Sequence, residues 1–245
     1  MTRTARPLAA AHTGCGAAPD NSWSSLLEGI ASGAAIVEVD VHVCKGGTAI
    51  LLHDDSPLLA ECTYEQLNRP EVRARLPSHD AAHELVKLED ALRELVSADL
   101  LVNLDLKSEA AIEPAMRLVR RLGAQDHVFT TGCSDGLPAR YPNIRAMWNA
   151  PTRVPEGEAD ETFARRVCGH AAAHRYHGLN LQHATCSEAV VRRARETGLP
   201  IWAYTVNDEE EMKRLIGLGI SAITTRKPGE LLRLLGNGNK EAIDG

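Results

Sequence analysis

The stretch IVEVDVHVCKGGTAILLHDD, residues 36–55, carries the pattern on which the predicted fold depends. Its first part alternates apolar and ionisable residues with period two, which indicates a β-strand that turns alternate side chains to opposite faces. Two glycines then indicate a tight turn, and a second apolar run ends on a histidine and two aspartates. We therefore predict a pair of strands that brings Glu38, Asp40 and His53 onto one face.

The register of this hairpin decides which side chains meet. If the two glycines form a two-residue turn, Lys45 faces Thr48 and the numbers of opposed residues sum to 93. Asp40 then lies directly across from His53, and directly opposed residues share a face. A shift of one residue would turn the histidine to the other face, so this prediction depends on the turn.

Outward from the hairpin, short β-prone runs alternate with amphipathic helical patterns along nearly the whole chain. Strands are predicted at residues 7–13, 35–41, 48–54, 100–107, 127–132, 144–150, 178–184, 200–206 and 221–225. Helices are predicted at residues 22–32, 88–98, 112–122, 162–174, 187–197 and 209–218, and several end at a glycine (Gly33, Gly123, Gly198, Gly219). This alternation predicts an α/β fold, a closed (β/α)8 TIM barrel, with one strand more than such a barrel needs.

The chain is predicted to form a single barrel domain over residues 1–235. No linker rich in Gly, Ser or Pro divides it, and we find no internal repeat. Residues 55–87 are the one long stretch without a clear strand, so we interpret them as a short insertion after the third strand, over the barrel mouth. Residues 236–245, GNGNKEAIDG, are expected to be a disordered tail.

Composition narrows the class of protein. A net charge of −6, from 27 Lys and Arg against 33 Asp and Glu, argues against a nucleic-acid partner bound through its phosphate backbone. The N-terminus lacks the apolar run of a secretory signal, and no stretch approaches the ~20 residues of a membrane span. We therefore expect a cytoplasmic protein. The six scattered cysteines are interpreted as free thiols in preference to a zinc site.

In a barrel of this kind, the chemistry gathers at the C-terminal ends of the strands. Those ends carry mostly ionisable residues: His12, Glu38, Asp40, His53, Asp105, Lys107 and Asn207. Carboxylates inside a parallel sheet are costly unless something pairs them. We therefore expect these side chains to converge on one site.

A metal ion would resolve the repulsion within such a cluster. Asp105 and Lys107 share a face by period two, so a third carboxylate joins Glu38 and Asp40. Three carboxylates about 4–5 Å apart repel by several kcal/mol per pair even at an effective dielectric of about 20. Oxygen ligands suit Mg²⁺ or Ca²⁺ better than zinc. Two histidines beside such a metal are what an in-line displacement at phosphorus needs, so the cluster indicates phosphoester chemistry.

Residues 10–55 resemble the N-terminal half of the glycerophosphodiester phosphodiesterase family, whose pattern is His-Arg-Gly, Pro-Glu-Asn, Glu-x-Asp and His-Asp. LVNLDLK at 101–107 is similar to the family's Asn-x-Glu-x-Lys strand, YTVND at 204–208 to its Trp-Thr-Val-Asn strand, and ISAITTRKP at 220–228 to its closing strand. The motifs occur in the family's order and span about residues 7–230. The resemblance implies a barrel of the PLC-like phosphodiesterase type and a small-molecule phosphodiester as substrate.

The resemblance also implies a role for each matching position. The implied metal is Mg²⁺ or Ca²⁺, held by Glu38, Asp40 and Asp105, and the implied acid/base pair is His12 and His53. Which histidine is the acid stays open. The implied substrate-binding residues follow the same strand ends and are Lys107, Thr13, Asn21, Tyr204 and Asn207.

Four positions depart from the family pattern. Thr13 stands where the family has arginine, which removes a bidentate phosphate ligand that a neutral hydroxyl cannot replace. Asp105 stands where the family usually has glutamate, but the related sphingomyelinase D toxins carry aspartate there, so metal ligation is still expected. Asp20 and Tyr204 replace a glutamate and a tryptophan. We interpret these changes as an altered substrate preference.

We expect a metal-dependent phosphodiesterase that cleaves a glycerophosphodiester, or a similar small phosphodiester, into an alcohol and a phosphomonoester such as glycerol 3-phosphate. Either water or a neighbouring hydroxyl of the substrate can supply the attacking oxygen. One alternative is a lysophospholipase D or sphingomyelinase D-like enzyme, which needs an apolar groove for an acyl chain. The other is a non-catalytic barrel that binds phosphodiesters. The oligomeric state stays open.

A second cluster of histidines has a simpler interpretation. The stretch HAAAHRYH places His170, His174 and His177 at i, i+4 and i+7 of a predicted helix, a spacing that can bind metal. No carboxylate or cysteine joins them at matching spacing. A solvated helix face is therefore favoured over a metal site.

Overall fold

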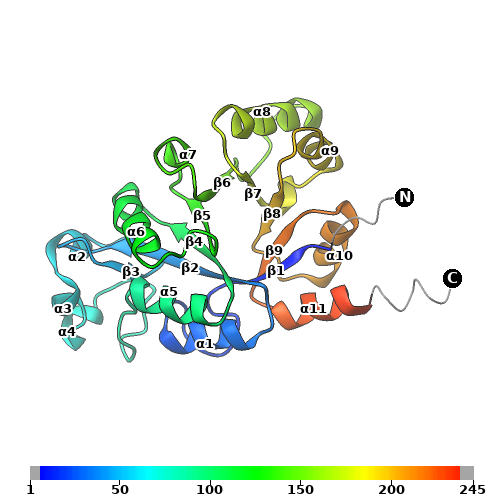
Figure 1. Ribbon diagram of the computed structural model, residues 1–245. Helices are drawn as coiled ribbons and strands as arrows, with labels where there is room; N and C mark the ends of the chain where they lie inside the picture. Colours follow the sequence, from blue (N-terminus) through cyan, green and yellow to red (C-terminus); the bar gives the residue numbers. More distant parts are fainter. Residues whose placement is uncertain (1–5, 238–245) are drawn as a thin grey trace.

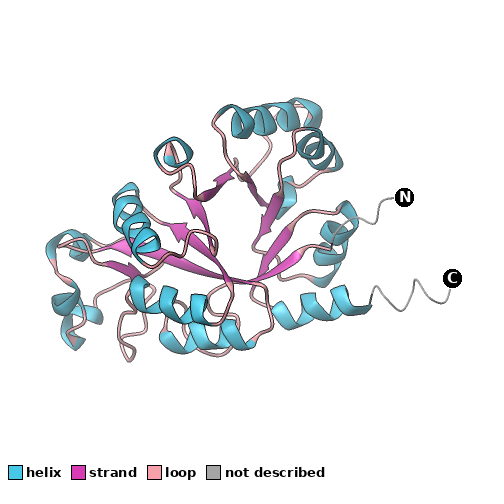
Figure 2. Ribbon diagram, viewed as in Figure 1, coloured by secondary structure: helices cyan, strands magenta, loops and turns pink. Residues whose placement is uncertain are grey.

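Eight parallel strands form a closed barrel in the computed structural model, which describes residues 6–237 (Figures 1 and 2). They are β1 (Leu8–Ala11), β2 (Ile36–Val43), β4 (Leu101–Leu106), β5 (Val128–Gly132), β6 (Arg145–Asn149), β7 (Gly178–Gln182), β8 (Ile201–Tyr204) and β9 (Ala222–Thr225). Neighbours pair in the order β1-β9-β8-β7-β6-β5-β4-β2, and pairing of β1 with β2 closes the ring. All eight runs were predicted as strands, and the predicted barrel is confirmed.

The extra strand is β3 (Ala49–Leu51), which pairs antiparallel to β2 and lies outside the ring. The predicted register of this hairpin is wrong by one residue: Val41 faces Leu51 and His42 faces Ile50, so opposed numbers sum to 92. The reason is the turn. The Cys44 backbone N–H donates to the Thr48 carbonyl at 3.0 Å, which encloses three loop residues, not two.

Asp40 therefore pairs with Leu52, whose backbone N–H donates to the Asp40 carbonyl at 3.2 Å. His53 comes after β3 has ended, so strand pairing does not hold it opposite Asp40. It reaches the barrel mouth from a loop instead. His53 lines the cavity at that mouth, by way of this loop and not by pairing with Asp40.

Helices surround the barrel, and seven of them follow or precede its strands: α1 (Trp23–Ala31), α5 (Leu88–Ser97), α6 (Glu109–Arg121), α8 (Asp160–Ala173), α9 (Glu188–Glu196), α10 (Glu209–Leu218) and α11 (Pro228–Asn237). The six predicted helices are present. The sequence reading missed α11, the four-residue α7 (Leu137–Arg140) and the short 3₁₀ turn η1 (His183–Thr185). The glycines predicted to end helices (Gly33, Gly123, Gly198, Gly219) all have positive φ.

The insertion after β3 contains three short helices, α2 (Pro57–Glu61), α3 (Tyr64–Leu67) and α4 (Pro70–Arg73). They lie beyond β3, at the left of Figure 1. Their apolar side chains form a small cluster with Ile50 and Leu52, separate from the main core. At the C-terminus, residues 236 and 237 belong to α11, so the predicted tail begins too early; residues 238–245 lie outside the described part of the chain.

The inside of the barrel changes from apolar to polar within one two-residue step. Near the N-terminal ends of the strands, six side chains pack together: Ala10, Ile36, Phe129, Met147, Trp202 and Ala222. Two residues further along each strand, the inward side chains are His12, Glu38, Thr131, Asn149, Tyr204 and Thr224, and these line a cavity. Period two keeps both sets on the inner face. The apolar layer therefore forms the floor on which the polar site lies.

Two expectations from composition are met within residues 6–237. The six cysteines are all free. No described helix has both the length and the apolar character required to cross a membrane.

Candidate active site

A cavity of about 250 Å³ opens at the C-terminal ends of the barrel strands. One side of it is lined by ionisable side chains: His12, Glu38, Asp40, His53, Asp105 and Lys107. These are all the residues that the sequence predicted for acid/base catalysis, metal ligation and phosphate binding by lysine. The rest of the lining is uncharged: Asn103, Thr131, Asn149, Asn180, Tyr204, Thr205 and Thr224.

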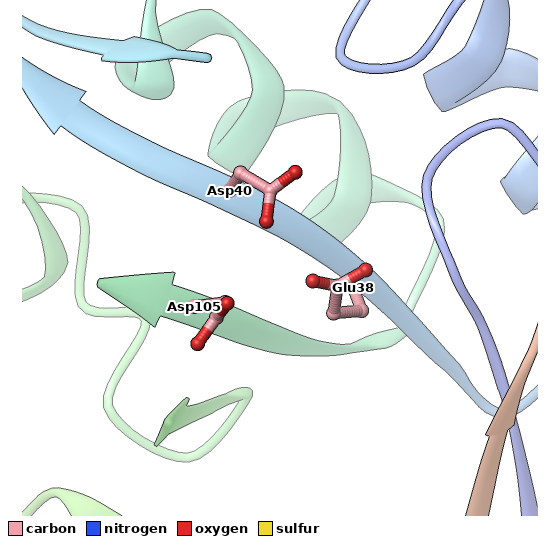
Figure 3. Close-up of side chains that lie close together, drawn as sticks. All are labelled: Glu38, Asp40 and Asp105. Atoms are coloured by element: carbon pink, nitrogen blue, oxygen red, sulfur yellow. The ribbon is translucent and has the colours of Figure 1, made fainter. Parts of the chain in front are cut away.

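Three carboxylates converge on the charged side (Figure 3). Glu38 and Asp40 point inward from β2, and Asp40 is in register with Asp105 on β4. One oxygen from each residue lies within 4.8 Å of the others, and no other group of this kind occurs among the described residues. Burial, together with the charges of Asp40 and Asp105, raises the pKa of Glu38 well above its usual value.

Lys107 partly neutralises this cluster. Its Nζ lies 2.7 Å from Asp40 Oδ1 and also forms an ion pair with Asp105. Burial alone would lower the pKa of Lys107, but the two carboxylates outweigh burial and raise it. One ammonium cannot balance three carboxylates. The remaining negative charge and the all-oxygen donor set fit a hard divalent cation such as Mg²⁺ or Ca²⁺.

Asn21 and Thr13 lie behind the carboxylates and do not line the cavity. Asn21 has a left-handed backbone (φ 58°), its Nδ2 donates to Asp40 Oδ2 at 2.7 Å, and its Oδ1 accepts from the Asp40 backbone N–H at 3.1 Å. Thr13 donates its backbone N–H to Glu38 Oε2 and accepts from the Asn21 N–H at 2.6 Å. Both were predicted to bind substrate. In the structure their hydrogen bonds orient Glu38 and Asp40, and a role in substrate binding stays a prediction.

The other two predicted substrate-binding residues differ in position. Tyr204 lines the cavity, whereas Asn207 is exposed and is absent from the lining. Asn207 Oδ1 accepts from Thr225 Oγ1 at 3.2 Å and from the Arg226 backbone N–H at 2.9 Å. It therefore ties the loop after β8 to the end of β9.

Both histidines line the cavity, His12 directly after β1 and His53 in the loop after β3. His12 Nδ1 lies 2.6 Å from the Thr13 carbonyl oxygen, which can only accept, so Nδ1 carries a proton and Nε2 is the free atom of the neutral ring. Burial is the largest cause of the lowered pKa of His12. His53 is about half exposed, and its Nδ1 lies 2.5 Å from Asp54 Oδ1.

Sequence reasoning missed the uncharged wall of the cavity. Asn180 Nδ2 donates to Asn149 Oδ1 at 2.8 Å across β6 and β7. Asn103 Nδ2 donates to Thr131 Oγ1, but its buried Oδ1 has no hydrogen-bond partner. The available signal was a polar residue at the inward position near a strand end, as in NLDLK and MWNA. This signal is weaker than a carboxylate in a strand, because Asn and Thr are common at strand ends without lining a site.

The histidines at 170, 174 and 177 belong to no group of converging metal ligands among the described residues. His170 stacks on Trp148 and on His174, with ring centroids 4.1 Å apart in each pair. His174 and His177 are exposed. None of the three lines the cavity, so His174 is a suitable control position.

The raised pKa of Glu38 predicts how pH affects stability without metal. Because the folded-state pKa lies above the unfolded value of about 4.3, protonated Glu38 favours the fold. That contribution is complete below the unfolded pKa and is lost as pH rises through the folded pKa. In EDTA, Glu38→Gln should therefore melt at a higher temperature than the wild type at pH 7.

The matched control for this prediction is Glu71→Gln, at an exposed position in α4. It should leave the pH dependence of the melting temperature unchanged. If Glu38→Gln melts below the wild type in EDTA at pH 7, then the interpretation that the Glu38 carboxylate destabilises the metal-free fold is wrong.

The comparisons with known proteins agree with this geometry. Residues 12–230 match the family described as "Glycerophosphoryl diester phosphodiesterase family". An uncharacterized protein, YqiK, of Bacillus subtilis is 29% identical over 93% of this chain and 98% of its own. A glycerophosphodiester phosphodiesterase of Bacillus altitudinis is 24% identical over 88% of this chain and 92% of its own.

One solved structure is similar over nearly the whole length. It is an Oleispira antarctica phosphodiesterase in complex with the product sn-glycerol-3-phosphate, with a TM-score of 0.75 and 20% sequence identity. The match covers 98% of each chain. At this identity the similarity supports the barrel fold.

Proposed function

Because this chain belongs to the glycerophosphoryl diester phosphodiesterase family and is a phosphoric diester hydrolase, we propose that it hydrolyses glycerophosphodiesters to an alcohol and glycerol 3-phosphate. One observation carries the proposal: a single small cavity brings His12 and His53 together with three carboxylates and Lys107. The product bound to the Oleispira antarctica phosphodiesterase, sn-glycerol-3-phosphate, supports the same substrate class.

In the proposed mechanism, the two histidines transfer protons on opposite sides of the phosphorus. The lowered pKa of His12 favours its neutral form at pH 7, and its free Nε2 takes a proton from the attacking oxygen. His53, at the exposed side of the mouth and oriented by Asp54, donates a proton to the departing alcohol oxygen. Lys107 offers its ammonium to the phosphate.

The proposed metal ligands are Glu38, Asp40 and Asp105. A bound Mg²⁺ or Ca²⁺ would polarise the phosphoryl oxygens and offset the negative charge that builds up during displacement. The chain's own contribution is orientation. Asn21 holds Asp40, the Thr13 backbone holds Glu38, and Thr131 Oγ1 donates to Asp105 Oδ1 at 3.0 Å.

The cavity lining favours a small polar alcohol over a lysolipid. No aliphatic side chain lines it, and Tyr204 is its one aromatic residue apart from the histidine rings. An acyl chain would gain no hydrophobic burial there. The carboxylate cluster favours a catalytic protein over a non-catalytic barrel. Buried like charges destabilise the fold, so their presence is best explained by a function that needs them.

The proposal is tested by turnover of a panel that contains glycerophosphodiesters, a lysolipid and bis(p-nitrophenyl) phosphate, each with Mg²⁺, with Ca²⁺ and with EDTA. We expect metal-dependent release of glycerol 3-phosphate from the glycerophosphodiesters. Faster cleavage of the lysolipid would favour the lysophospholipase D alternative. Tight binding of the diesters without turnover of any substrate would favour a non-catalytic barrel.

The amide pair of Asn149 and Asn180 predicts which part of the substrate is recognised. Both residues line the cavity, and the bond between their amides leaves the Asn180 oxygen and the Asn149 NH₂ group available, a pattern that suits hydroxyl groups. Asn149→Leu and Asn180→Leu should each raise the KM for a glycerophosphodiester about tenfold, the usual effect of losing a buried hydrogen bond.

Bis(p-nitrophenyl) phosphate provides the control because it carries no hydroxyl group. Its KM should change much less in both variants. An equal rise in KM for both substrates would mean that the two asparagines support the barrel wall and do not recognise hydroxyl groups.

A further inference from the structure

Arg226 lies directly after β9, at the edge of the cavity mouth. Thr225 pairs with Ala11 of β1, so Arg226 and His12 follow neighbouring strands at the same level. Thr224, two residues before Arg226, lines the cavity, whereas Arg226 itself lies in the bend after the strand, outside the lining. Its side chain is 39% exposed, so solutes entering the mouth can reach it.

The guanidinium has hydrogen-bonding capacity left over. Nη1 donates to Asp20 Oδ1 at 2.8 Å and to the Gly14 carbonyl at 3.3 Å, and Nη2 donates to Asp20 Oδ2. Arginine has five N–H donors, so these bonds leave Nε–H and one N–H of Nη2 without a partner among the described residues. Those two groups lie on one edge of the guanidinium plane, where they can bind an oxyanion side-on.

The Asp20–Arg226 ion pair also interacts electrostatically with residues of the proposed active site. The charge of Arg226 contributes to the lowered pKa of His12, after burial. The pKa of Arg226 is raised first by its hydrogen bonds to Asp20, and the charges of Glu38 and Asp40 add to this. The pKa of Asp20 is lowered mainly by Arg226, and the charges of His12 and His53 add smaller contributions. The Asp20–Arg226 pair is therefore within electrostatic range of both histidines.

Gly14 fixes the position of this pair. A side chain at residue 14 would meet Asp20 Oδ1 at 1.9 Å and Arg226 Nη1 at 2.5 Å, and its φ of +70° also disfavours other residues. Thr13, by contrast, is buried against Ser25 and Asn21 and offers nothing to the mouth. Besides the histidines, Lys107 is the only cation in the described cavity lining.

We propose that Arg226 binds a non-bridging oxygen of the substrate phosphate through its free edge, with Asp20 holding the guanidinium in place. This proposal rests on the proposed function, since it places a phosphodiester between the histidines. In this proposal the loop after β9 supplies a guanidinium to the phosphate. The residue directly after His12 cannot supply one, because it is a buried threonine. Two positively charged side chains then bind the phosphate, Lys107 from β4 and Arg226 from β9.

The test compares Arg226→Met, Arg226→Lys and Asp20→Asn with the wild type in Mg²⁺. Arg233→Met is the matched control, because Arg233 forms a similar ion pair with Glu209 on the outer surface. Two quantities are measured: the KM and kcat for a glycerophosphodiester, and the rise in melting temperature caused by inorganic phosphate. The second measurement needs no turnover.

Arg226→Met should raise the KM and the Kd for phosphate by about 10- to 100-fold, as expected for a lost charge-assisted hydrogen bond. The kcat should fall less than tenfold, and Arg226→Lys should lie between Met and the wild type. Asp20→Asn should weaken phosphate binding less than Arg226→Met does, because the amide oxygen can still accept one of the two hydrogen bonds that hold the guanidinium. Arg233→Met should match the wild type.

A purely structural ion pair would give a different result, with Arg226→Met and Asp20→Asn impaired to the same extent. That outcome overturns the proposal, and so does an unchanged Kd for phosphate in Arg226→Met and Arg226→Lys. If the wild type binds phosphate but cleaves no glycerophosphodiester, the proposed function fails while the phosphate titration still decides the role of Arg226.

Discussion

Alanine in place of His12 or His53 is expected to lower kcat by about two to four orders of magnitude, the range for loss of a positioned acid or base. Stability should change little, because His53 is half exposed and His12 makes one side-chain hydrogen bond, to a backbone carbonyl. The measurement is steady-state turnover of a glycerophosphodiester, together with the melting temperature of each variant.

The two losses should not add. Both groups act on one displacement, so the double variant should lose much less than the product of the two single effects. His174→Ala, on an exposed part of the chain remote from the cavity lining, is the matched control and should turn over substrate like the wild type. Full activity in either single variant would remove that histidine from the mechanism.

Removing the metal, or one of its carboxylates, is expected to abolish turnover. Glu38→Ala and Asp40→Ala each delete one of three oxygen ligands that converge within 4.8 Å. A metal at about a hundred times its Kd should stabilise the wild type by roughly 2.7 kcal/mol. Both variants should lose this stabilisation, which is measured as the difference between melting temperatures in Mg²⁺ or Ca²⁺ and in EDTA.

The stability of the variants without metal adds a second readout, because the Lys107 ammonium already pairs with Asp40 and Asp105. Without metal, the alanine variants should be as stable as the wild type or more stable, since each removes one of the repelling charges. If the melting temperature of the wild type is the same in Mg²⁺, in Ca²⁺ and in EDTA, the proposed metal site is wrong. Retained turnover in both variants would contradict its role in catalysis.

Local periodicity explains why much of the site could be predicted from the sequence. Period two in a strand is set by the backbone of neighbouring residues, so Glu38 and Asp40 share a face, as do Asp105 and Lys107, whatever surrounds them. Helix ends at glycines with positive φ are equally local. Alternation of strands and helices then implied the barrel, and a barrel collects strand ends at one mouth.

The hairpin shows where local reasoning stops. A two-residue and a three-residue turn differ little in sequence, yet this difference changes the residue opposite Asp40 from His53 to Leu52. His53 joins the cavity because the chain beyond β3 turns back to the barrel mouth. That path depends on the insertion packing against Ile50 and Leu52, which are contacts between distant segments.

The roles of Thr13, Asn21 and Arg226 were also decided by tertiary structure. Thr13 and Asn21 follow the first strand in a loop, where no periodicity tells which side chains turn inward. Arg226 meets Asp20 only because β9 pairs with β1 and closes the ring, across 206 residues of sequence. The sequence by itself determined which residues share a strand face, because that is a property of neighbouring backbone. Barrel closure decided which faces meet, because contacts between distant strands are set by packing of the whole chain.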